Sequence, residues 1–486
     1  MPLFDTHKQK GFMLLGVLIF SAIAIIIVTA FVRWGQVSIT LSRRVLAREQ
    51  ALDIAEAGIE HTRWYLSHFQ SEYTFGTEDD GPYTYPFYNK DGVQIGMYTI
   101  TITPPMTGSS LVSIRSTGTL TSDSSVSRTI NVKIAIPSFA KYAVVANDNM
   151  RFGSGTVTYG PIHSNGGIRF DGLAYNKITS ALAKYDDPDH DDSGAEKLEF
   201  GVHTHLNTSG VVQESYRPLE VPPAVMQART DVFKAGRELS VPAVDFAGIT
   251  TDLATIKAGA QSAGRYFPAS GSRGYQMILK TNDTFDVYRV NTLVSAPSGC
   301  STNGEAEWGT WSINTKTFVG NYAIPENGLV FFEDNVWVEG TINTARITIA
   351  SARFPDSPTT RKSITVNNNL TYTNEDGQDV IALIAQNNIN VGMVSQSNLG
   401  IDAALVAQNG RAGRFYYKNC STYDSRTRIT LYGMIATSKR YGFAYTDGTG
   451  YATRIISYDT NLLYAPPPNF PLAADNYQII SWEELE

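Results

Sequence analysis

The longest apolar run of the chain lies near its N-terminal end, from Gly11 to Val32, and contains no charged residue. Lys8 and Lys10 precede this run, and Arg33 follows it. A helix needs about 20 apolar residues to cross a hydrocarbon layer about 30 Å thick, so this run is long enough to span a membrane. Because basic residues flank its short N-terminal side, we expect a cytoplasmic N-terminus and an extracytoplasmic remainder.

The same run also fits an ordinary signal anchor or an uncleaved secretory signal. A secretory signal has a shorter apolar region that ends in a small-residue cleavage site. This run instead ends in Phe31-Val32-Arg33-Trp34, which contains no such site. The pattern therefore argues against a secretory signal and leaves an ordinary anchor as the alternative.

The helical pattern continues well beyond the apolar run. No proline occurs between Leu3 and Gly81, so nothing in the sequence forces a break. Apolar residues recur every seven positions, at Val45, Leu52, Ile59 and Leu66. We therefore predict one helix over residues 12–70, about 90 Å long at 1.5 Å per residue. The alternative is a short anchor followed by an unrelated coiled coil.

The basic leader with Lys10-Gly11-Phe12, the apolar run and the helix that reaches Ala55-Glu56-Ala57-Gly58-Ile59 together resemble the N-terminus of a type IV pilin. More narrowly, they are similar to minor pilins of the PilX class and to the K pseudopilin of type II secretion. The resemblance implies that a membrane peptidase removes a leader of residues 1–11, which holds Lys8 and Lys10. The cut would follow Gly11, and Phe12 would become the N-methylated first residue.

One position departs from the pilin pattern. Most pilins carry a glutamate at the fifth place of the mature chain, where this chain has Gly16. A carboxylate in lipid is costly unless it is paired, and in the family it is thought to meet the amine of a neighbouring subunit. Without it, this chain resembles a minor, tip-located subunit more than a major one. Gly16 and Glu56 are the positions that we assign to assembly within the helix.

The resemblance also implies partners and a location. The partners would be other pilins and minor pilins, the prepilin peptidase and the inner-membrane assembly platform. The protein would sit in the inner membrane before assembly and in a cell-surface filament afterwards, with its head outside the cytoplasm. A surface glycan or a host molecule is the expected ligand of the head.

The net charge of −7 argues against general affinity for nucleic acid. Loss of residues 1–11 would remove two lysines and one aspartate and move the charge to −8. Nucleic-acid binding depends on clustered lysine and arginine, which this chain lacks. Charged residues make up only 17% of the chain, and turn-forming residues are abundant, as is usual in extracellular β-rich proteins.

Residues 96–102, 110–118 and 127–136 alternate apolar and polar side chains, and turn residues separate them. This alternation predicts antiparallel strands that pack on the helix, after a loop over residues 71–91. The resemblance to pilins implies the same arrangement.

Further along, short apolar strands alternate with asparagine and glycine. Ala382-Leu383-Ile384-Ala385-Gln386-Asn387 nearly recurs as Ala404-Leu405-Val406-Ala407-Gln408-Asn409, 22 residues on. A repeat of 20–25 residues predicts the rungs of a parallel β-helix, with asparagine ladders at the corners. An irregular β-sandwich is the competing interpretation.

Residues 222–236 and 250–263 have helical composition and would form an insertion outside the solenoid, with Thr250 as a cap. Residues 275–279 and 284–290 are typical of a hairpin.

The predicted fold class is α+β and mainly β, with a long N-terminal helix, a small antiparallel sheet and a β-solenoid head. The predicted divisions are a leader (1–11), the transmembrane and assembly helix (12–70), a pilin-like β subdomain (71–140), a first solenoid part (141–215), a helical insertion (216–265), a hairpin with the main solenoid (266–465) and a C-terminal tail (466–486).

The chain has two cysteines, Cys300 and Cys420, and both lie in polar turn sequences. Outside the cytoplasm such a pair can form a disulfide, which would add about 4–5 kcal/mol on the chain-entropy estimate. Two unpaired thiols are the alternative.

Candidate metal ligands occur in Asp186-Asp187-Pro188-Asp189-His190-Asp191-Asp192. Asp187, Asp189 and Asp191 alternate and could present oxygen ligands to calcium. The calcium-loop pattern fails at Asp192, where it needs glycine, and at Leu198, where it needs glutamate, so a solvated acidic loop is the simpler interpretation. His203-Thr204-His205 could form half of a metal site, but no cysteine accompanies it and it reads as incidental. We expect no other cofactor.

No motif of an enzyme is present. Asp402, Asp424 and several arginines lie in the predicted solenoid, but their spacing does not distinguish a site from ordinary rung-edge charges. The sequence favours a non-enzymatic, pilin-like subunit that displays its head for filament initiation, adhesion or secretion. The alternatives are a membrane-anchored adhesin or polysaccharide-binding β-helix outside any filament, and a glycan-active enzyme.

Overall fold

A computed structural model describes residues 8–105, 110–136, 138–190, 198–213, 220–222, 225–246, 249–301, 309–471 and 476–485. The chain divides into two compact units. Unit 1 comprises residues 1–104, 112–134 and 479–486, and unit 2 comprises residues 105–111 and 135–478. Unit 2 is thus inserted into unit 1 along the sequence.

Unit 1 begins with the helix α1, Lys8–His68, which is 61 residues long. The predicted helix of residues 12–70 is therefore confirmed as one continuous element. Within its first half, apolar side chains such as Met13, Phe20 and Phe31 are exposed. Its second half buries a stripe of small and aliphatic residues at helical spacing, namely Ala51, Ile54, Ala55, Ile59, Thr62 and Leu66. Of the predicted heptad, Ile59 and Leu66 join this stripe, whereas Val45 is exposed.

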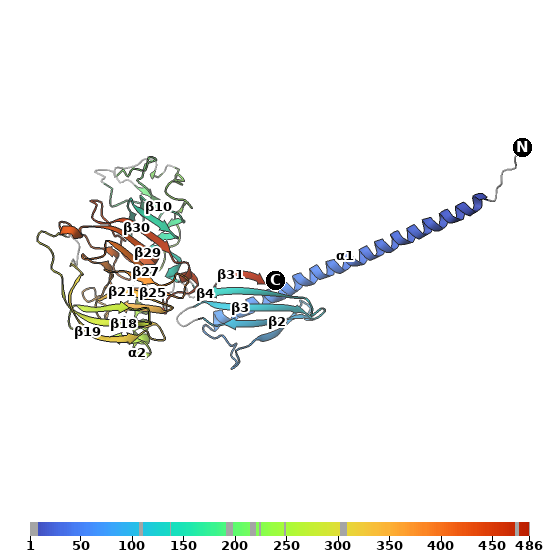
Figure 1. Ribbon diagram of the computed structural model, residues 1–486, viewed down its shortest axis with the longest axis horizontal. Helices are drawn as coiled ribbons and strands as arrows, with labels where there is room; N and C mark the ends of the chain where they lie inside the picture. Colours follow the sequence, from blue (N-terminus) through green and yellow to red (C-terminus); the bar gives the residue numbers. More distant parts are fainter. Residues whose placement is uncertain are drawn as a thin grey trace. The chain divides into compact units, whose positions relative to one another are not determined.

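The stripe packs on a sheet in the order β1-β2-β3-β4-β31, in which β1 to β4 pair antiparallel. Its strands are β1 (Tyr83–Tyr88), β2 (Gln94–Thr103), β3 (Val112–Leu120), β4 (Ser127–Ala135) and β31 (Gln478–Leu485). Figure 1 shows β2 and β3 alongside the second half of α1. The predicted strands correspond to β2, β3 and β4, but the predicted loop of residues 71–91 is wrong, because β1 lies within it.

The last strand of the chain, β31, completes this sheet beside β4. An ion pair between Arg128 of β4 and Glu484 of β31 joins the two strands. The predicted C-terminal tail, residues 466–486, therefore includes a strand of unit 1.

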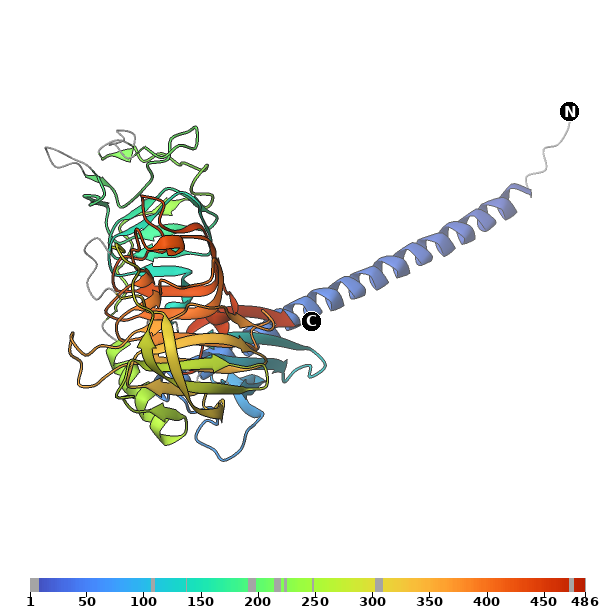
Figure 2. The same ribbon diagram turned by 60° about the vertical axis from the view of Figure 1, so that its left-hand side comes forward.

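Unit 2 is a parallel β-solenoid (Figure 2). One ladder of parallel strands runs in the order β16-β20-β22-β25-β27-β29-β5-β8-β11-β15. The bounds of these strands are Arg265–Phe267, Leu329–Phe332, Arg346–Ser351, Val380–Ala385, Asn398–Ala407, Ser425–Thr437, Val144–Ala146, Ile162–Ser164, Ile178–Ser180 and Arg237–Glu238. The ladder passes from β29 directly to β5, so the C-terminal rungs stack on the first rungs of the head, as the neighbouring red and teal strands show (Figure 2).

The other strands of unit 2 form further ladders. A second parallel ladder runs β17-β21-β24-β27-β29-β30-β7-β10, and two shorter ones run β23-β26-β28 and β6-β9-β14. The bounds not yet given are β6 (Met150–Phe152), β7 (Thr156–Tyr159), β9 (Ile168–Phe170), β10 (Leu173–Ala174), β12 (Lys184–Tyr185), β13 (Glu199–Phe200), β14 (Val202–His203), β17 (Gly274–Leu279), β18 (Thr284–Leu293), β19 (Ile313–Ala323), β21 (Val336–Ile342), β23 (Ile364–Thr365), β24 (Leu370–Tyr372), β26 (Ile389–Val391), β28 (Ala412–Arg414), β30 (Gly450–Tyr458), η1 (Phe139–Lys141), η3 (Ser421–Tyr423) and α3 (Asn461–Tyr464).

The 22-residue repeat in the sequence corresponds to two adjacent rungs, in which residues 22 positions apart pair with each other. Ala382 pairs with Ala404, and Ala385 pairs with Ala407, between β25 and β27. The side chains of Leu383 and Leu405 stack in one buried apolar cluster, and alternation sends their neighbours to the other face. The predicted solenoid is confirmed, and the predicted hairpin is β17 paired with β18.

The asparagine side chains at the corners of the rungs bond mainly to backbone groups, rather than to one another as the predicted ladders require. Asn335, Asn369 and Asn388 each accept a hydrogen bond from a backbone N–H of the next rung. A direct amide pair occurs between Asn165 and Asn147, at 2.7 Å. Most of these side chains therefore cap backbone groups that the turn leaves without a ladder partner.

Helix α2, Ile249–Ser262, lies where the second insertion helix was expected. The first expected helix, over residues 222–236, is wrong: the described part of this stretch is turns and extended chain around Phe233. Phe233 and Val232 are buried in the solenoid core, so core packing rather than helical propensity decides this segment.

Candidate functional site

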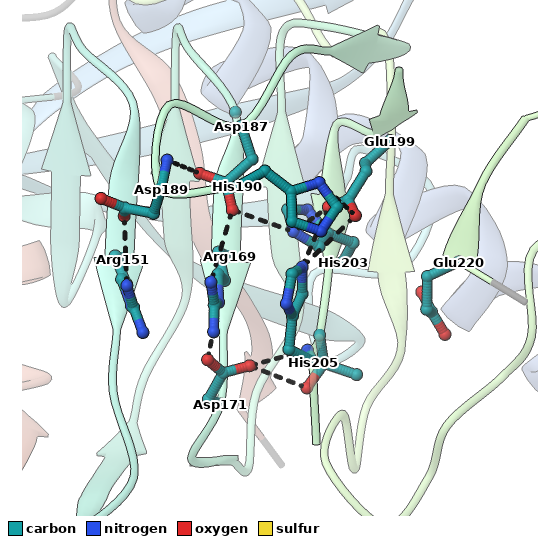
Figure 3. Close-up of polar contacts among 12 residues, drawn as sticks. Arg151, Arg169, Asp171, Asp187, Asp189, His190, Glu199, His203, His205 and Glu220 are labelled. Atoms are coloured by element: carbon teal, nitrogen blue, oxygen red, sulfur yellow. Dashed lines mark hydrogen bonds and ion pairs between the residues drawn. The ribbon is translucent and has the colours of Figure 1, made fainter. Parts of the chain in front are cut away.

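A buried cluster of histidine and carboxylate side chains lies on one wall of the solenoid, at the ladder β6-β9-β14. Asp187, Glu199, His203 and His205 each offer one ligand atom, and these atoms lie within 4.8 Å of one another. Figure 3 shows the four side chains converging. Asp187 follows β12, Glu199 lies on β13, His203 ends β14, and His205 comes two residues later.

The ladder explains how the histidines reach this position. Met150, Ile168 and Val202 pair across the three strands and point into the apolar core. The next residues along the strands therefore point to the other face, where Arg151, Arg169 and His203 form a column of basic groups. The segment that contains Asp187 and Asp189 passes over this column (Figure 3).

Each basic group of the column meets a carboxylate. Arg169 donates from Nε to Asp171 Oδ2 at 2.8 Å, and its Nη1 lies 3.8 Å from Asp187 Oδ2. His203 Nε2 lies 3.5 Å from the same Asp187 oxygen and in direct contact with Glu199. Asp171 also accepts a hydrogen bond from the backbone N–H of His205, at 2.7 Å, which holds the loop after β14 against the column.

The orientation of His205 is set from outside the cluster. Its Nδ1 lies 2.9 Å from the carbonyl oxygen of Gln213, which can only accept, so Nδ1 carries the proton. The lone pair of a neutral His205 is therefore on Nε2, which lies 3.3 Å from Glu199 Oε1 and 3.4 Å from Glu199 Oε2. Histidine ligands of metals are commonly oriented by such a bond from the other ring nitrogen.

The cluster is closed to solvent. Glu199, His203 and His205 have no exposed surface, and Asp187 is 3% exposed. His203 Nδ1, Asp187 Oδ2 and Glu199 Oε1 make no hydrogen bond of regular geometry within the described part of the chain. Buried polar atoms are normally satisfied, so this arrangement needs either protons or a cation between the groups.

Burial and the neighbouring charges act in opposite directions on these groups. Burial raises the pKa of Glu199, but the imidazoles of His203 and His205 outweigh it and bring the pKa to about 2. Burial lowers the pKa of His203, yet Asp187 and Glu199 outweigh it and raise that pKa. The carboxylates are thus ionised at neutral pH, and the site attracts positive charge.

The aspartates of the expected calcium loop have different contacts in the structure. Asp187 joins the histidine cluster, whereas Asp189 forms ion pairs with Arg440 and, at 3.6 Å, with Arg151. Asp191 lies outside the described residues. Asp187 and Asp189 therefore do not converge on one position, and the paired histidines, read as incidental in the sequence, take part in the cluster instead.

No sequence motif could have located this cluster, because its members are separated by 12, 4 and 2 positions and depend on the ladder register. The one available signal was the coincidence of His203-Thr204-His205 with an acidic stretch a short distance upstream.

Cys300 and Cys420 form a disulfide, with Cα atoms 4.4 Å apart. Next to it, Asp424 accepts hydrogen bonds from the backbone N–H groups of Asn419 and Cys420, at 2.9 and 2.6 Å. Arg414 and Arg426 are buried and donate to backbone carbonyls, including that of Met393. These charges order loops of the solenoid, which accounts for their place at the edge of the rungs.

A shallow cleft of about 340 Å³ lies beside Trp337 on unit 2. Its polar side chains bond to one another: Lys316 donates to Gln276 at 2.6 Å, and Gln276 donates to Glu339 at 2.9 Å. Trp337 is only 3% exposed, so it offers no open aromatic face for a sugar ring.

The residues of the expected leader and assembly sites lie on α1. Lys8, Lys10, Gly11 and Phe12 are in its first turns, and the leader before Lys8 lies outside the described residues. Gly16 has no atom of another residue near the position of a Cβ, and Glu56 is exposed. Among the described helices, one is long and apolar enough to cross a membrane, and it covers Met13–His68.

No family model matches, and no curated protein matches. A solved structure, the competence-associated pilin ComZ from Thermus thermophilus, matches over 90% of this chain and 97% of its own, at 12% identity and a TM-score of 0.30.

Proposed function

We propose that this chain is a minor, pilin-like subunit that enters a type IV pilus or pseudopilus through α1 and displays unit 2. The observation that carries the proposal is the contrast between the two halves of that helix. Apolar side chains of its first half, such as Leu14, Ile26 and Phe31, are more than half exposed, while in its second half a stripe from Ala51 to Leu66 is buried against the sheet of unit 1.

A helix segment that is apolar on all sides needs an apolar environment. Lipid provides that environment before assembly, and the packed helices of other pilins and minor pilins provide it afterwards. Lys8 and Lys10 would hold the N-terminal end on the cytoplasmic side, where the prepilin peptidase and the assembly platform act. The membrane segment and the sheet then have the roles of anchor and support for unit 2.

Gly16 supports a place at the tip. A subunit in the shaft would use a carboxylate at this position to neutralise the amine of a neighbour, whereas a tip subunit has no such requirement. Gly16→Glu would then increase incorporation along the shaft. Unchanged incorporation would remove the support for a tip position.

The proposed role is non-enzymatic, and it covers filament initiation, adhesion or secretion. The use of Arg414, Arg426 and Asp424 in ordering loops of unit 2 supports this role. A membrane-anchored adhesin that stays outside filaments is the alternative that the experiment must separate.

The test compares processing of the full chain in cells that contain a prepilin peptidase. We expect the wild type to lose residues 1–11 and the variant Gly11→Val to keep them. Gly35→Ala, a change at a helical glycine with no near neighbour, is the control and should be processed like the wild type. A wild-type chain that keeps its leader in the presence of the peptidase would overturn the proposal.

A further inference from the structure

The cluster of Asp187, Glu199, His203 and His205 has the donor set of a metal site, and its four ligand atoms lie within 4.8 Å of one another. Glu199 Oε1 and His205 Nε2, at 3.3 Å, both present lone pairs when the imidazole is neutral. Two lone pairs at this distance repel unless a proton or a cation lies between them. His203 Nε2 and Asp187 Oδ2 face each other at 3.5 Å in the same crowded space.

Charge also favours a divalent cation. Asp171, Asp187 and Glu199 carry three negative charges in a closed volume, and Arg169, at 2.8 Å from Asp171, offsets one of them. Two charges remain beside the imidazoles of His203 and His205, and the Nδ1 of a third imidazole, His190, lies 3.5 Å from Glu199 Oε1. A divalent ion at the centre of the four ligand atoms neutralises them without protonating either histidine, and a buried uncompensated charge is costly.

The donors select among metals. Calcium requires six to eight oxygen ligands, and magnesium prefers octahedral oxygen and water ligands. Two imidazole nitrogens and two carboxylate oxygens suit tetrahedral zinc, for which metal–ligand distances near 2.0–2.2 Å separate neighbouring ligand atoms by about 3.3 Å. The separations of 3.3 Å between Glu199 and His205 and of 3.5 Å between Asp187 and His203 agree with this edge length, whereas His203 and Glu199 lie closer together and would have to move apart for zinc to bind.

We propose that Asp187, Glu199, His203 and His205 form a structural zinc site in unit 2. All four ligand positions belong to the protein and the cluster is closed to solvent, which is the character of structural rather than catalytic zinc. The ion would fasten Asp187, after β12, and Glu199, on β13, to the ladder β6-β9-β14, and the backbone carbonyl of Gln213 would orient His205 through its Nδ1.

The experiment measures bound metal in the full-length protein, purified in detergent, stripped with EDTA, reloaded with zinc and desalted. We expect about one zinc per chain in the wild type. His203→Ala and His205→Ala should each retain less than about a tenth of that amount. His163→Ala is the matched control, since His163 is another fully buried histidine of the solenoid, bonded to Thr179 rather than to carboxylates, and it should bind zinc like the wild type.

A second measurement on the wild type alone does not depend on how the variants fold. EDTA should lower its thermal midpoint, zinc should restore it, and calcium should not. Cobalt in place of zinc should give the visible absorption of a tetrahedral ion. A wild-type protein that binds no zinc and melts identically with EDTA would overturn the proposal, because protons alone would then hold the cluster together. Restoration by calcium instead of zinc would overturn it as well.

Discussion

Asp402, on β27, is a carboxyl group in a setting that disfavours its charge. It accepts a hydrogen bond from the backbone N–H of Tyr372 at 3.1 Å. Burial and the nearby charges of Glu375 and Asp459 nevertheless raise its pKa to about 6. The folded chain therefore binds the proton of Asp402 more tightly than the unfolded chain, whose aspartate pKa is about 3.9.

This shift predicts the effect of pH and of one substitution. Because the folded state holds the extra proton between pH of about 4 and 6, the contribution of Asp402 to the free energy of unfolding falls as pH rises through this window. Asp402→Asn, which keeps the acceptor oxygen, should raise the free energy of unfolding at pH 7.5 by about 1–2 kcal/mol, after allowance for partial solvent screening. The gain should disappear near pH 4.

Chemical denaturation of wild type and variant at both pH values measures the effect. Asp376→Asn, at an exposed aspartate that accepts a hydrogen bond from the backbone N–H of Gln378, is the control and should change little at either pH. An Asp402→Asn variant less stable than the wild type at pH 7.5 would show that the carboxylate is favourable where it stands.

Gly118, on β3, is a point at which the sheet of unit 1 lies directly against the backbone of α1. A Cβ at this position would lie 2.1 Å from the carbonyl oxygen of Ala51 and 2.5 Å from the nitrogen of Ala55. Both are backbone atoms, which cannot move without moving the helix. Gly118→Val should therefore destabilise unit 1 by about 3 kcal/mol or more.

Hydrogen exchange resolves this effect along the chain. Amides of β2, β3 and β4 should exchange faster in Gly118→Val, while those of β25 and β27 in unit 2 should not change. Arg115→Val, at an exposed position of the same strand, is the control. Unchanged exchange in β3 of Gly118→Val would mean that the helix and sheet are not packed as described.

At the scale of elements, β31 shows how both ends of the chain build unit 1. It pairs beside β4 and forms an ion pair through Glu484. A chain that stops before Gln478 would leave the edge of β4 without a partner, and we expect its amides to exchange at least tenfold faster as a result. Glu484→Gln, which removes only the ion pair, should have a much smaller effect. Equal protection of β4 in the truncated chain would contradict the pairing.

The disulfide joins the segment that follows β18 to the segment that follows β28, across a sequence separation of 120 residues. Such a link restricts the unfolded chain, and its loss should reduce the free energy of unfolding by up to about 4–5 kcal/mol on the chain-entropy model. We expect the double variant Cys300→Ser and Cys420→Ser to melt lower than the wild type. A reductant should lower the wild type to the same midpoint and leave the double variant unchanged, and an unaffected wild type would contradict the prediction.

The elements that the sequence predicted well are those whose pattern is local. The helix α1 follows from an uninterrupted apolar and then amphipathic run, and the register of β25 on β27 follows from a 22-residue repeat. The strand β1 was hidden in a segment rich in tyrosine, glycine and proline. The segment around Phe233 had helical composition, but the burial of that ring in the solenoid core decided its conformation.

At the scale of the whole molecule, the order of rungs could not be derived from sequence. The ladder passes from β29 to β5 and then to β8, so strands almost 300 residues apart are neighbours. The histidine–carboxylate cluster depends on the same long-range registers, in which Arg169 pairs with His203 across β9 and β14. Local spacing contains neither relation.

The molecule thus combines a helix suited to membrane and filament with a solenoid that carries its own buried site. The proposal that the chain is a processed filament subunit is tested most directly by the intact mass of the protein recovered from sheared surface filaments. We expect a chain that begins at N-methylated Phe12 and is present in the sheared fraction. A chain that still begins at Met1 and is confined to the membrane would contradict the claim.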